Sequence, residues 1–515
     1  MEEKKENFKR SLNPRDLDNG LRVSDFSAVT KQQGFATYEK LGLKAGLEIH
    51  QQLDVGKKLF CNCQSFLRSD KEDFVVRRKL HSVAGESGQV DSAVAYEASL
   101  EKTFLYQGYN DTTCLVEIDE EPPRLINEDA LNETLKIALL LNCEIYSATQ
   151  IMRKTVIDGS NTSGFQRTVL IGHDGFIETS FGKVRIATIA LEEDAARLVE
   201  GKKEKEVVYR LDRLGIPLVE ISTYPDLKTP EQIKECALKL GDILRSCKVK
   251  RGLGTIRQDV NISIKGHDKV EIKGFQDPKM MNKTVEFEIE RQIEDLENGK
   301  IEGEVRNALS DGRSEFLRPI PGAARMYPET DLPLLYFKRE RLDSLKKQLP
   351  KLRHEIRDEL KKKGVQEDLI SLVLEELEEF EVLLKVYSKD ANLIAKMVSL
   401  WRNEIATKSG KNNFEIKDIL SERVLEIILE AVRDKKILES DVKKVMSDVA
   451  FGIEVEKAII IERASEDELE EKILGIIKEK PGLRVNAYMG MIIQKLGTGI
   501  DKKKTMEILE RVLKN

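Results

Sequence analysis

LKAGLEIHQQL, residues 43–53, alternates apolar and polar side chains and therefore predicts a β-strand with two different faces. The apolar side chains at odd positions point to one face, whereas Glu48 and His50 point to the other. A polar face that simply meets water explains such a strand as well, because antiparallel sheets often bury only one side. The stretch thus indicates a sheet and leaves open whether Glu48 and His50 are functional.

Three further segments have the same character. TIRQDVNISIK, residues 255–265, and VEIKG, residues 270–274, alternate in the same way, and KVRIATIAL, residues 183–191, runs directly into an acidic cluster. Their polar positions are Arg257, Asp259 and Asn261, then Glu271 and Lys273, and finally Glu192, Glu193 and Asp194. Carboxylates on rigid strands suit a hard divalent cation such as Mg²⁺. Exposed ion pairs and an acidic helix start are the ordinary alternatives.

One clear helix interrupts the strands between Leu43 and Lys273. TPEQIKECALKLGDILRSC, residues 229–247, offers Thr229 as N-cap and Pro230 at the first helical position. Apolar residues then recur at helical spacing along the segment. Short strands with few helices predict an α+β fold for this part of the chain.

After residue 340 the sequence pattern changes: apolar residues recur at helical spacing over long stretches, and Lys and Glu are frequent between them. EDLISLVLEELEEFEVLLKVY, residues 367–387, predicts one such helix. We expect a helical domain at 341–447 and a tail domain at 448–515, whose last part, residues 462–515, predicts three short helices. The sheet-rich domain then covers 39–340, and residues 1–38 form an N-terminal extension.

Composition predicts a cytoplasmic protein with several domains. The chain has 515 residues, 40% hydrophobic and 34% charged, which suggests about three domains with their own cores. It has no apolar run of the roughly 18 to 20 residues that span a membrane, and its start lacks the apolar centre of a signal peptide. The net charge of −6 argues against nucleic-acid binding over the whole surface and permits a local basic patch.

Six cysteines are too few for a disulfide framework in so long a chain. Cys61 and Cys63 lie close together in KLFCNCQSF, and Cys114 follows in TTCLVEID. A complete zinc knuckle would place a fourth cysteine at position 117, where the sequence has Glu117. The sequence favours a structural role without metal, and a zinc site with a fourth ligand from elsewhere is the alternative.

Taken in order, these stretches resemble the GatB/GatE family, the amidotransferase proteins that make glutaminyl-tRNA from glutamyl-tRNA(Gln). The archaeal GatE type is more similar than the bacterial GatB type. The motifs that carry the resemblance are GLEIHQQLDVGKKLFCNC, LVEIDEEPP, IATIALEEDAAR, YRLDRLGIPLVEISTYPD, GTIRQDVNISIKG, KVEIKGFQ and RMYPETDLP. They extend over most of the region before residue 340. The resemblance implies a cradle-like kinase domain, followed by a helical domain and a tail domain.

The resemblance implies a ligase that forms a carbon–nitrogen bond with glutamine as amide donor. ATP would phosphorylate the γ-carboxylate of glutamate on tRNA(Gln), and ammonia would then displace phosphate. Activation is needed because a carboxylate would have to expel oxide, whereas an acyl phosphate has a good leaving group. Such a reaction calls for Mg²⁺, carboxylates to hold it and cations to bind phosphates.

Specific residues follow from the same resemblance. Catalysis and Mg²⁺ binding are expected at Glu48, His50, Glu193 and Glu271. Contacts to ATP or the acyl phosphate are expected from Arg257, Asp259, Asn261, Lys273 and Arg213. Contacts to tRNA are expected from Lys502, Lys503 and Lys504 in the tail. Imidazole favours softer ions than Mg²⁺, so His50 could equally orient water or phosphate.

The resemblance further implies a partner, the asparaginase-like amidase GatD, in a heterotetramer or similar complex that channels ammonia. Proteins of the GatE type usually carry an inserted domain, whereas here residues 300–303 alone join the flanking segments. A GatB-like role in a three-subunit enzyme and a non-catalytic tRNA-binding scaffold are the alternative functions.

Overall fold

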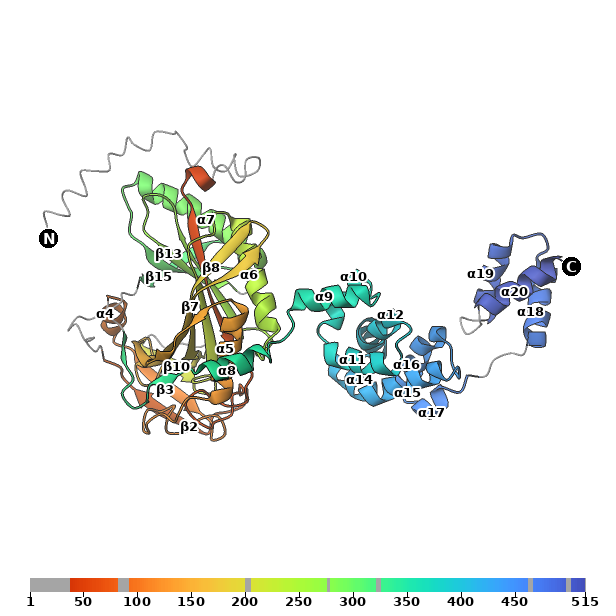
Figure 1. Ribbon diagram of the computed structural model, residues 1–515, viewed down its shortest axis with the longest axis horizontal. Coiled ribbons are helices and arrows are strands. Elements are labelled where there is room, and N and C mark those ends of the chain that lie inside the picture. The colour runs from red at the N-terminus through yellow and green to blue at the C-terminus, as the bar shows by residue number, and fades with distance from the viewer. Residues whose placement is uncertain are drawn as a thin grey trace. The chain divides into compact units, whose positions relative to one another are not determined.

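The structure is a computed structural model, which describes residues 38–81, 92–199, 205–275, 278–320, 326–461, 466–496 and 502–514. The chain divides into two compact units, residues 1–352 and 353–515. The expected α+β class is confirmed, because the first unit combines a large sheet with helices (Figure 1). Of the expected N-terminal extension, only Tyr38 belongs to the described residues.

The first unit contains three sheets within the described residues. The largest has 11 strands in the order β15-β14-β13-β12-β1-β11-β8-β7-β6-β16, with β4 paired to β7. Two smaller sheets have the orders β2-β3-β10-β9 and β17-β5. The strands are β1 (Lys44–Gln52), β2 (Phe74–Arg78), β3 (Thr103–Gly108), β4 (Glu144–Ile145), β5 (Ala148–Thr149), β6 (Ile151–Thr155), β7 (Phe165–Thr179), β8 (Gly182–Glu193), β9 (Arg197–Leu198), β10 (Glu206–Arg210), β11 (Pro217–Thr223), β12 (Ile256–Ser263), β13 (Val270–Phe275), β14 (Glu304–Ala308), β15 (Ser314–Pro319), β16 (Met326–Pro328) and β17 (Leu335–Tyr336).

Helices cover one face of the large sheet. The helices of this unit are α4 (Ser92–Ser99), α5 (Glu128–Leu140), α6 (Pro230–Arg245), α7 (Pro278–Glu297) and α8 (Arg339–Lys346). α5, α6 and α7 contribute to the same hydrophobic core as the apolar face of β1, which includes Leu47 and Ile49. Burial of this area is the main stabilising contribution to the unit. The opposite face of β1, with Glu48 and His50, is therefore free to line a cavity.

The predicted helix start at Thr229 is confirmed. The Thr229 side chain accepts a hydrogen bond from the backbone N–H of Gln232 at 3.2 Å, and the Gln232 side chain accepts one from the N–H of Lys228 at 2.8 Å. Pro230 opens α6, and the apolar face of this helix, including Ile233 and Leu240, is fully buried. Local capping and periodicity thus determine this helix.

A short connection joins α7 to β14 where the family resemblance predicts an inserted domain. Only residues 298–303 lie between the two elements. A Cβ atom on Gly303 would come within 2.1 Å of the Lys269 carbonyl oxygen, so only glycine fits this close backbone approach. The connection is therefore packed tightly against the sheet.

The second unit consists of helices. They are α9 (Arg353–Lys362), α10 (Glu367–Val373), α11 (Leu377–Val386), α12 (Ala391–Ala395), the π-helix η3 (Lys396–Trp401), α13 (Arg402–Ser409), α14 (Asn413–Ile419), α15 (Glu422–Arg433), the 3₁₀ helix η4 (Glu439–Asp441), α16 (Val442–Ala450), α17 (Val455–Ala458), α18 (Glu466–Glu479), α19 (Val485–Leu496) and α20 (Lys502–Lys514). One hydrophobic core joins residues of α9 to α17, and another joins α18, α19 and α20. The prediction of three short helices in the last part of the tail is confirmed.

The prediction of one helix over residues 367–387 is wrong. α10 ends at Val373 and α11 begins at Leu377, with Glu376 outside helical geometry at φ −124°. Residues of both helices, such as Ile370 and Phe380, pack in the same core. The break between the helices lets each of them direct its apolar face into that core. Tertiary packing has overridden a continuous helical pattern.

In the described part of the chain, none of the helices combines the length and apolar content that crossing a membrane requires.

Candidate functional site

A row of ionisable side chains follows the open face of β1 and its neighbours. In the antiparallel register, Glu48 lies opposite Asp259 of β12, and His50 lies opposite Arg257 of β12 and Glu220 of β11. Because side chains of directly opposed residues share a face, the pairing brings these groups together. Four of the residues predicted to act on phosphate or metal thus meet on two adjacent strands.

His50 sits among three carboxylates. Its Nε2 atom lies 3.5 Å from Glu48, 3.5 Å from Glu192 and 3.4 Å from Glu220. Burial would lower the pKa of His50, but the hydrogen bond and charge of Glu220 and the charges of Glu192 and Glu48 raise it to about 9. The ammonium of Lys154 lies 2.8 Å from Glu192 and 3.4 Å from Glu220. In this arrangement His50 carries a proton at neutral pH.

A second group of oxygen donors adjoins the first. Glu48, Asp259 and Glu271 have carboxylate oxygens within 4.8 Å of one another. Lys273 donates to Asp259 at 2.9 Å and also forms an ion pair with Glu271. Burial and the charge of Glu220 nevertheless raise the pKa of Glu48 to about 7. Burial is the larger of these two causes, and the charges of His50 and Lys273 act in the opposite direction. The three clustered carboxylates themselves are the feature that suits a further cation.

Residues of both groups, with the exception of Glu220, line one cavity of about 570 Å³. This volume suits a ligand of nucleotide size. Its cationic lining consists of Lys154, Arg257, Lys269, Lys273 and Arg318, and its acidic lining includes Glu48, Glu192, Asp259 and Glu271. Carboxylates for a metal and cations for phosphates are thus placed in the same pocket.

The region that contains the cavity matches a known protein family. A family model described as the GatB/GatE catalytic domain matches residues 43–343, which contain every residue of the cavity. The chain belongs to the GatB/GatE family. Similar curated proteins are named as GatE-type components of glutamyl-tRNA(Gln) amidotransferase. The protein of Methanocaldococcus jannaschii is 36% identical over 93% of this chain and 99% of the relative.

Two further relatives bear the same name. That of Methanosarcina acetivorans is 31% identical over 93% of this chain and 98% of the relative. That of Methanococcus vannielii is 50% identical over 55% of this chain and 46% of the relative. The alignment with the M. jannaschii protein extends over 638 positions, more than the 515 residues present here. This GatB/GatE family member therefore lacks residues that its relative has.

Glu193 is not among the groups that the structure brings together around Glu48 and His50. Glu192 and Glu193 are successive residues of β8 and point to opposite faces of the sheet. The Glu193 carboxylate instead accepts a hydrogen bond from the backbone N–H of Arg167 at 3.1 Å and pairs with its guanidinium at 3.3 Å. The neighbouring Glu192 takes the place beside His50 that the family resemblance gave to Glu193.

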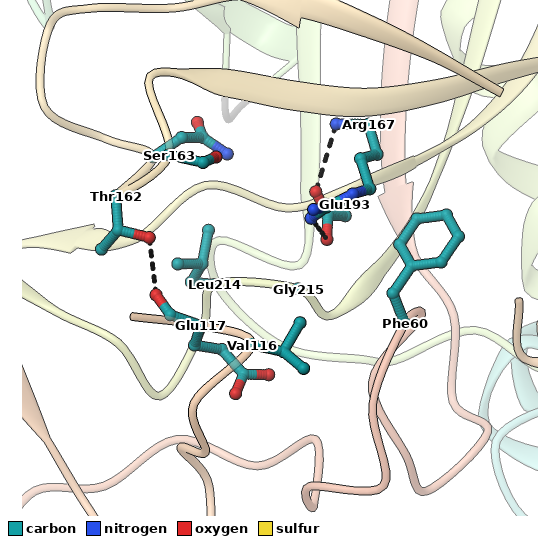
Figure 2. Close-up of a pocket in the computed structure, with 10 residues that line it drawn as sticks. Phe60, Val116, Glu117, Thr162, Ser163, Arg167, Glu193, Leu214 and Gly215 are labelled. Carbon is teal, nitrogen blue, oxygen red and sulfur yellow. Dashed lines mark hydrogen bonds and ion pairs between the residues drawn. The ribbon is translucent and has the colours of Figure 1, made fainter. Parts of the chain in front are cut away.

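A second, much smaller cavity lies beside Glu193 (Figure 2). It has a volume of about 10 Å³, enough for one water molecule. Arg167 and Glu193 form one part of its lining, and Val116 and Glu117 form another, as Figure 2 shows. The two carboxylates of the acidic pair on β8 thus serve two different cavities.

The remaining residues predicted to bind phosphate differ in their surroundings. Arg257 donates to the buried Asp194 at 3.0 Å, and Arg213 donates to the carbonyls of Ala195 at 2.7 Å and Ala196 at 2.9 Å. Arg257 lines the large cavity, whereas Arg213 is absent from its lining. The buried Oδ1 atom of Asn261 has no hydrogen-bond partner among the described residues.

The tRNA contacts expected in the tail fall partly outside the described residues. Lys502, Lys503 and Lys504 open α20, and their side chains are outside the described part of the structure.

Sequence reasoning missed several residues of the site. Lys154 belongs to IMRKT on β6, which lacks clean alternation, and Arg318 lies on β15, far along the chain. Glu192 belongs to the acidic cluster of the sequence, but alternation separates it from Glu193 only once β8 is known to extend to Glu193. The pairing register between strands, which the sequence does not show, determines which of these side chains meet in the site.

Glu329 directly follows β16, and its side chain is fully buried. It accepts hydrogen bonds from Arg153 Nε at 2.9 Å and from Arg167 Nε at 2.8 Å. Burial alone would raise the pKa of Glu329, but Arg153, the backbone of Asp331 and Arg167 hold it below its ordinary value. The ionised carboxylate therefore stabilises the fold above the ordinary pKa of glutamate, and the contribution is lost as pH falls through the lower pKa of the folded state.

We expect Glu329→Gln to lower the free energy of unfolding by about 2 kcal/mol at neutral pH, because a charged hydrogen-bond acceptor is lost. Thermal unfolding at several pH values measures the difference, which should narrow as the solution is acidified below about pH 4. The control is Asp331→Asn, in the same loop but half exposed, which should change stability by less than about 0.5 kcal/mol. Equal effects of the two variants would contradict the prediction.

Proposed function

We propose that this chain activates and amidates glutamyl-tRNA(Gln), as the names of its relatives indicate for them. The observation that carries the proposal is the large cavity of the matched domain, where two groups of carboxylates meet several cations. In the first step the γ-carboxylate of glutamate attacks the γ-phosphorus of ATP and ADP leaves. In the second step ammonia attacks the acyl carbon, phosphate leaves and a proton is lost.

The donor set fits Mg²⁺. Glu48, Asp259 and Glu271 offer three carboxylate oxygen ligands within 4.8 Å of one another, and hard cations prefer oxygen ligands. We infer that these three residues hold the metal. When bound, Mg²⁺ would neutralise charge on the phosphates. The imidazole of His50, protonated beside Glu192 and Glu220, is better suited to donate a hydrogen bond to phosphate or water than to ligate a hard ion.

Cations in the cavity have the complementary role. Lys154, Arg257, Lys273 and Arg318 would bind the phosphates of ATP and the charge that develops on the transferred phosphoryl group. Lys273 is already held by Asp259 and Glu271, so its position is fixed before substrate binds. Preorganised charge of this kind lowers the barrier because it needs no rearrangement during the reaction.

The partners are part of the proposal. Ammonia would come from the asparaginase-like amidase GatD, and tRNA(Gln) would contact the tail helices that contain Lys502, Lys503 and Lys504. The proposed setting is the cytoplasm, where tRNA is aminoacylated. Relatives of the GatE type favour this pairing over a three-subunit, GatB-like enzyme.

The test is ADP formation by the purified chain with Mg²⁺ and ATP. Glutamyl-tRNA(Gln) should stimulate ADP release, and uncharged tRNA(Gln) is the matched control because it lacks the carboxylate. With ¹⁵N-labelled ammonium added, the amino acid released from the tRNA should be labelled glutamine. Binding of glutamyl-tRNA(Gln) without ADP formation would refute the proposal and favour a non-catalytic scaffold.

A further inference from the structure

Asp194, the last residue of the acidic cluster after β8, is a buried carboxylate with hydrogen bonds to both of its oxygens. Its Oδ2 atom accepts a hydrogen bond from Gln52 Nε2 at 2.6 Å, and its Oδ1 atom accepts one from the backbone N–H of Ala195 at 2.9 Å. Oδ1 also accepts a hydrogen bond from Arg257 Nη2 at 3.0 Å. The described lining of the large cavity includes Arg257 but not Asp194. Asp194 can therefore act on the cavity only through its partners.

Two arginines share the charge of Asp194. Arg213 Nε lies 3.8 Å from the carboxylate, and the same guanidinium donates hydrogen bonds to the carbonyls of Ala195 and Ala196. Burial would raise the pKa of Asp194, but the charges of Arg257 and Arg213 hold it below its ordinary value. The carboxylate is therefore ionised at neutral pH. One carboxylate between two guanidinium groups leaves a net positive charge, which suits phosphate.

The guanidinium of Arg257 keeps most of its donors for the cavity. A guanidinium has five N–H donors in a rigid planar fork. Among the described residues, the Arg257 side chain makes one hydrogen bond, which goes to Asp194. Fixing one edge of the fork at a buried carboxylate sets the direction of the remaining donors. Those donors can then bind a phosphate group in a bidentate manner.

Two other carboxylates of the cavity attract Arg257. Burial would lower the pKa of Arg257, but Asp194 raises it through its charge and its hydrogen bond. The charges of Asp259 and Glu192, which line the cavity, act in the same direction. Asp259 belongs to the proposed metal ligands, so a guanidinium that moved onto it would occupy an oxygen that the metal needs. The bond to Asp194 keeps Arg257 apart from that oxygen.

We propose that Asp194 is a positioning residue, which directs the guanidinium of Arg257 toward the phosphates and keeps it away from the metal-binding carboxylates. This inference rests on the proposed function, because that function supplies the phosphates and the metal. Gln52 holds the Asp194 carboxylate, and Arg213 holds the backbone that follows it. Arg213 thereby supports the site from behind the cavity wall and does not itself contact phosphate.

Binding of Mn²⁺ to the full chain, followed by electron paramagnetic resonance, tests this role without ATP or tRNA. Mn²⁺ is the probe because it prefers oxygen ligands, as Mg²⁺ does. We expect Asp194→Asn to weaken Mn²⁺ binding about tenfold, since the released Arg257 would pair with Asp259. Asp226→Asn is the matched control, because Asp226 pairs with the exposed Arg185 at 2.7 Å, outside the cavity. It should bind Mn²⁺ like the wild type.

A double variant separates positioning from structural damage. Once Arg257 is removed, no guanidinium can move onto Asp259, so Asp194→Asn should have little further effect. Asp194→Asn combined with Arg257→Met should bind Mn²⁺ within about twofold of Arg257→Met alone. A double variant that still binds about tenfold more weakly than Arg257→Met would overturn the proposal. So would an Asp194→Asn variant that binds Mn²⁺ as tightly as the wild type.

Gln52→Met keeps the proposal testable if Asp194→Asn fails to fold. This change leaves every charge in place and removes the hydrogen bond to Asp194 Oδ2. It should weaken Mn²⁺ binding about threefold, and in that case an unchanged affinity would count against the proposal. A wild type that binds no Mn²⁺ would also overturn it. If the Mn²⁺ results are as expected but glutamyl-tRNA(Gln) elicits no ADP, the proposed function fails and the role of Asp194 beside the metal ligands is supported.

Discussion

Replacing Glu48 by glutamine is expected to reduce tRNA-stimulated ADP formation by about 10³-fold, the largest catalytic effect of any single change in the cavity. Among the described residues, Glu48 is the one shared by the two candidate ligand groups around the large cavity, one with His50 and Glu220 and one with Asp259 and Glu271. Glutamine keeps the shape but removes the charge that a cation would neutralise. The rate of ADP release at saturating ATP and Mg²⁺ measures the loss.

Stability separates this effect from misfolding. The raised pKa of Glu48 means that its ionised form is disfavoured in the folded chain, so stability falls as the pH rises from the ordinary pKa of glutamate to about 7, and the full cost is present above that. Glu48→Gln should therefore leave the melting temperature in metal-free buffer unchanged or higher. Added Mg²⁺ should stabilise the wild type and have a much smaller effect on the variant.

The matched control is Glu144→Gln, the same chemical change on β4 at an exposed position of the same sheet. It should leave both ADP formation and the response to Mg²⁺ unaltered. If Glu48→Gln retained full activity, the assignment of the metal to Glu48, Asp259 and Glu271 would be wrong. Loss of activity together with a large fall in melting temperature would point to structural damage instead.

Strand alternation in the sequence was enough to distinguish the polar face of β1, with Glu48 and His50, from the apolar face that packs in the core. It placed Glu48 and His50 together, and likewise Arg257 and Asp259, because the period of two is a local property of an extended backbone. It could not supply the register that sets His50 opposite Glu220, since that depends on pairing with a strand some 170 residues away.

For Glu192 and Glu193, the direction of each side chain depends on where β8 ends, which the sequence does not show. If the strand ends before Glu192, both glutamates start a new element and their directions are undetermined. With β8 continuing to Glu193, parity sends one carboxylate to His50 and the other to Arg167. The different roles of the two glutamates therefore follow from the fact that β8 includes its last two residues, and sequence patterns do not locate the ends of elements that accurately.

In the helical unit, Arg402→Met is expected to lower the free energy of unfolding by about 4 kcal/mol. Arg402 is nearly fully buried and donates to both oxygens of Glu379, at 2.8 and 2.7 Å, and to the Leu420 carbonyl at 2.7 Å. It thereby joins α11, α13 and the end of α14. Methionine fills similar volume but leaves the Glu379 carboxylate buried without its cation, which is the costly outcome.

Trp401, the single tryptophan of the chain, makes the measurement specific to this unit. It directly precedes Arg402 and packs partly buried against the helical core. Its fluorescence during urea unfolding therefore reports the second unit, whatever the stability of the first. Arg423→Met is the control, because Arg423 is mostly exposed and its ion pair with Glu426 contributes at most about 0.5 kcal/mol.

A double variant decides whether the buried charge is the cause. Arg402→Met combined with Glu379→Leu removes both partners of the ion pair. The Leu420 carbonyl then loses its donor, and the Val398 carbonyl loses a longer hydrogen bond of 3.4 Å. Because replacing a buried pair by apolar residues is often neutral, the double variant should recover at least half of the stability lost in the single variant. An additive loss would instead show that Arg402 acts mainly through packing and its bond to Leu420, with the ion pair contributing little.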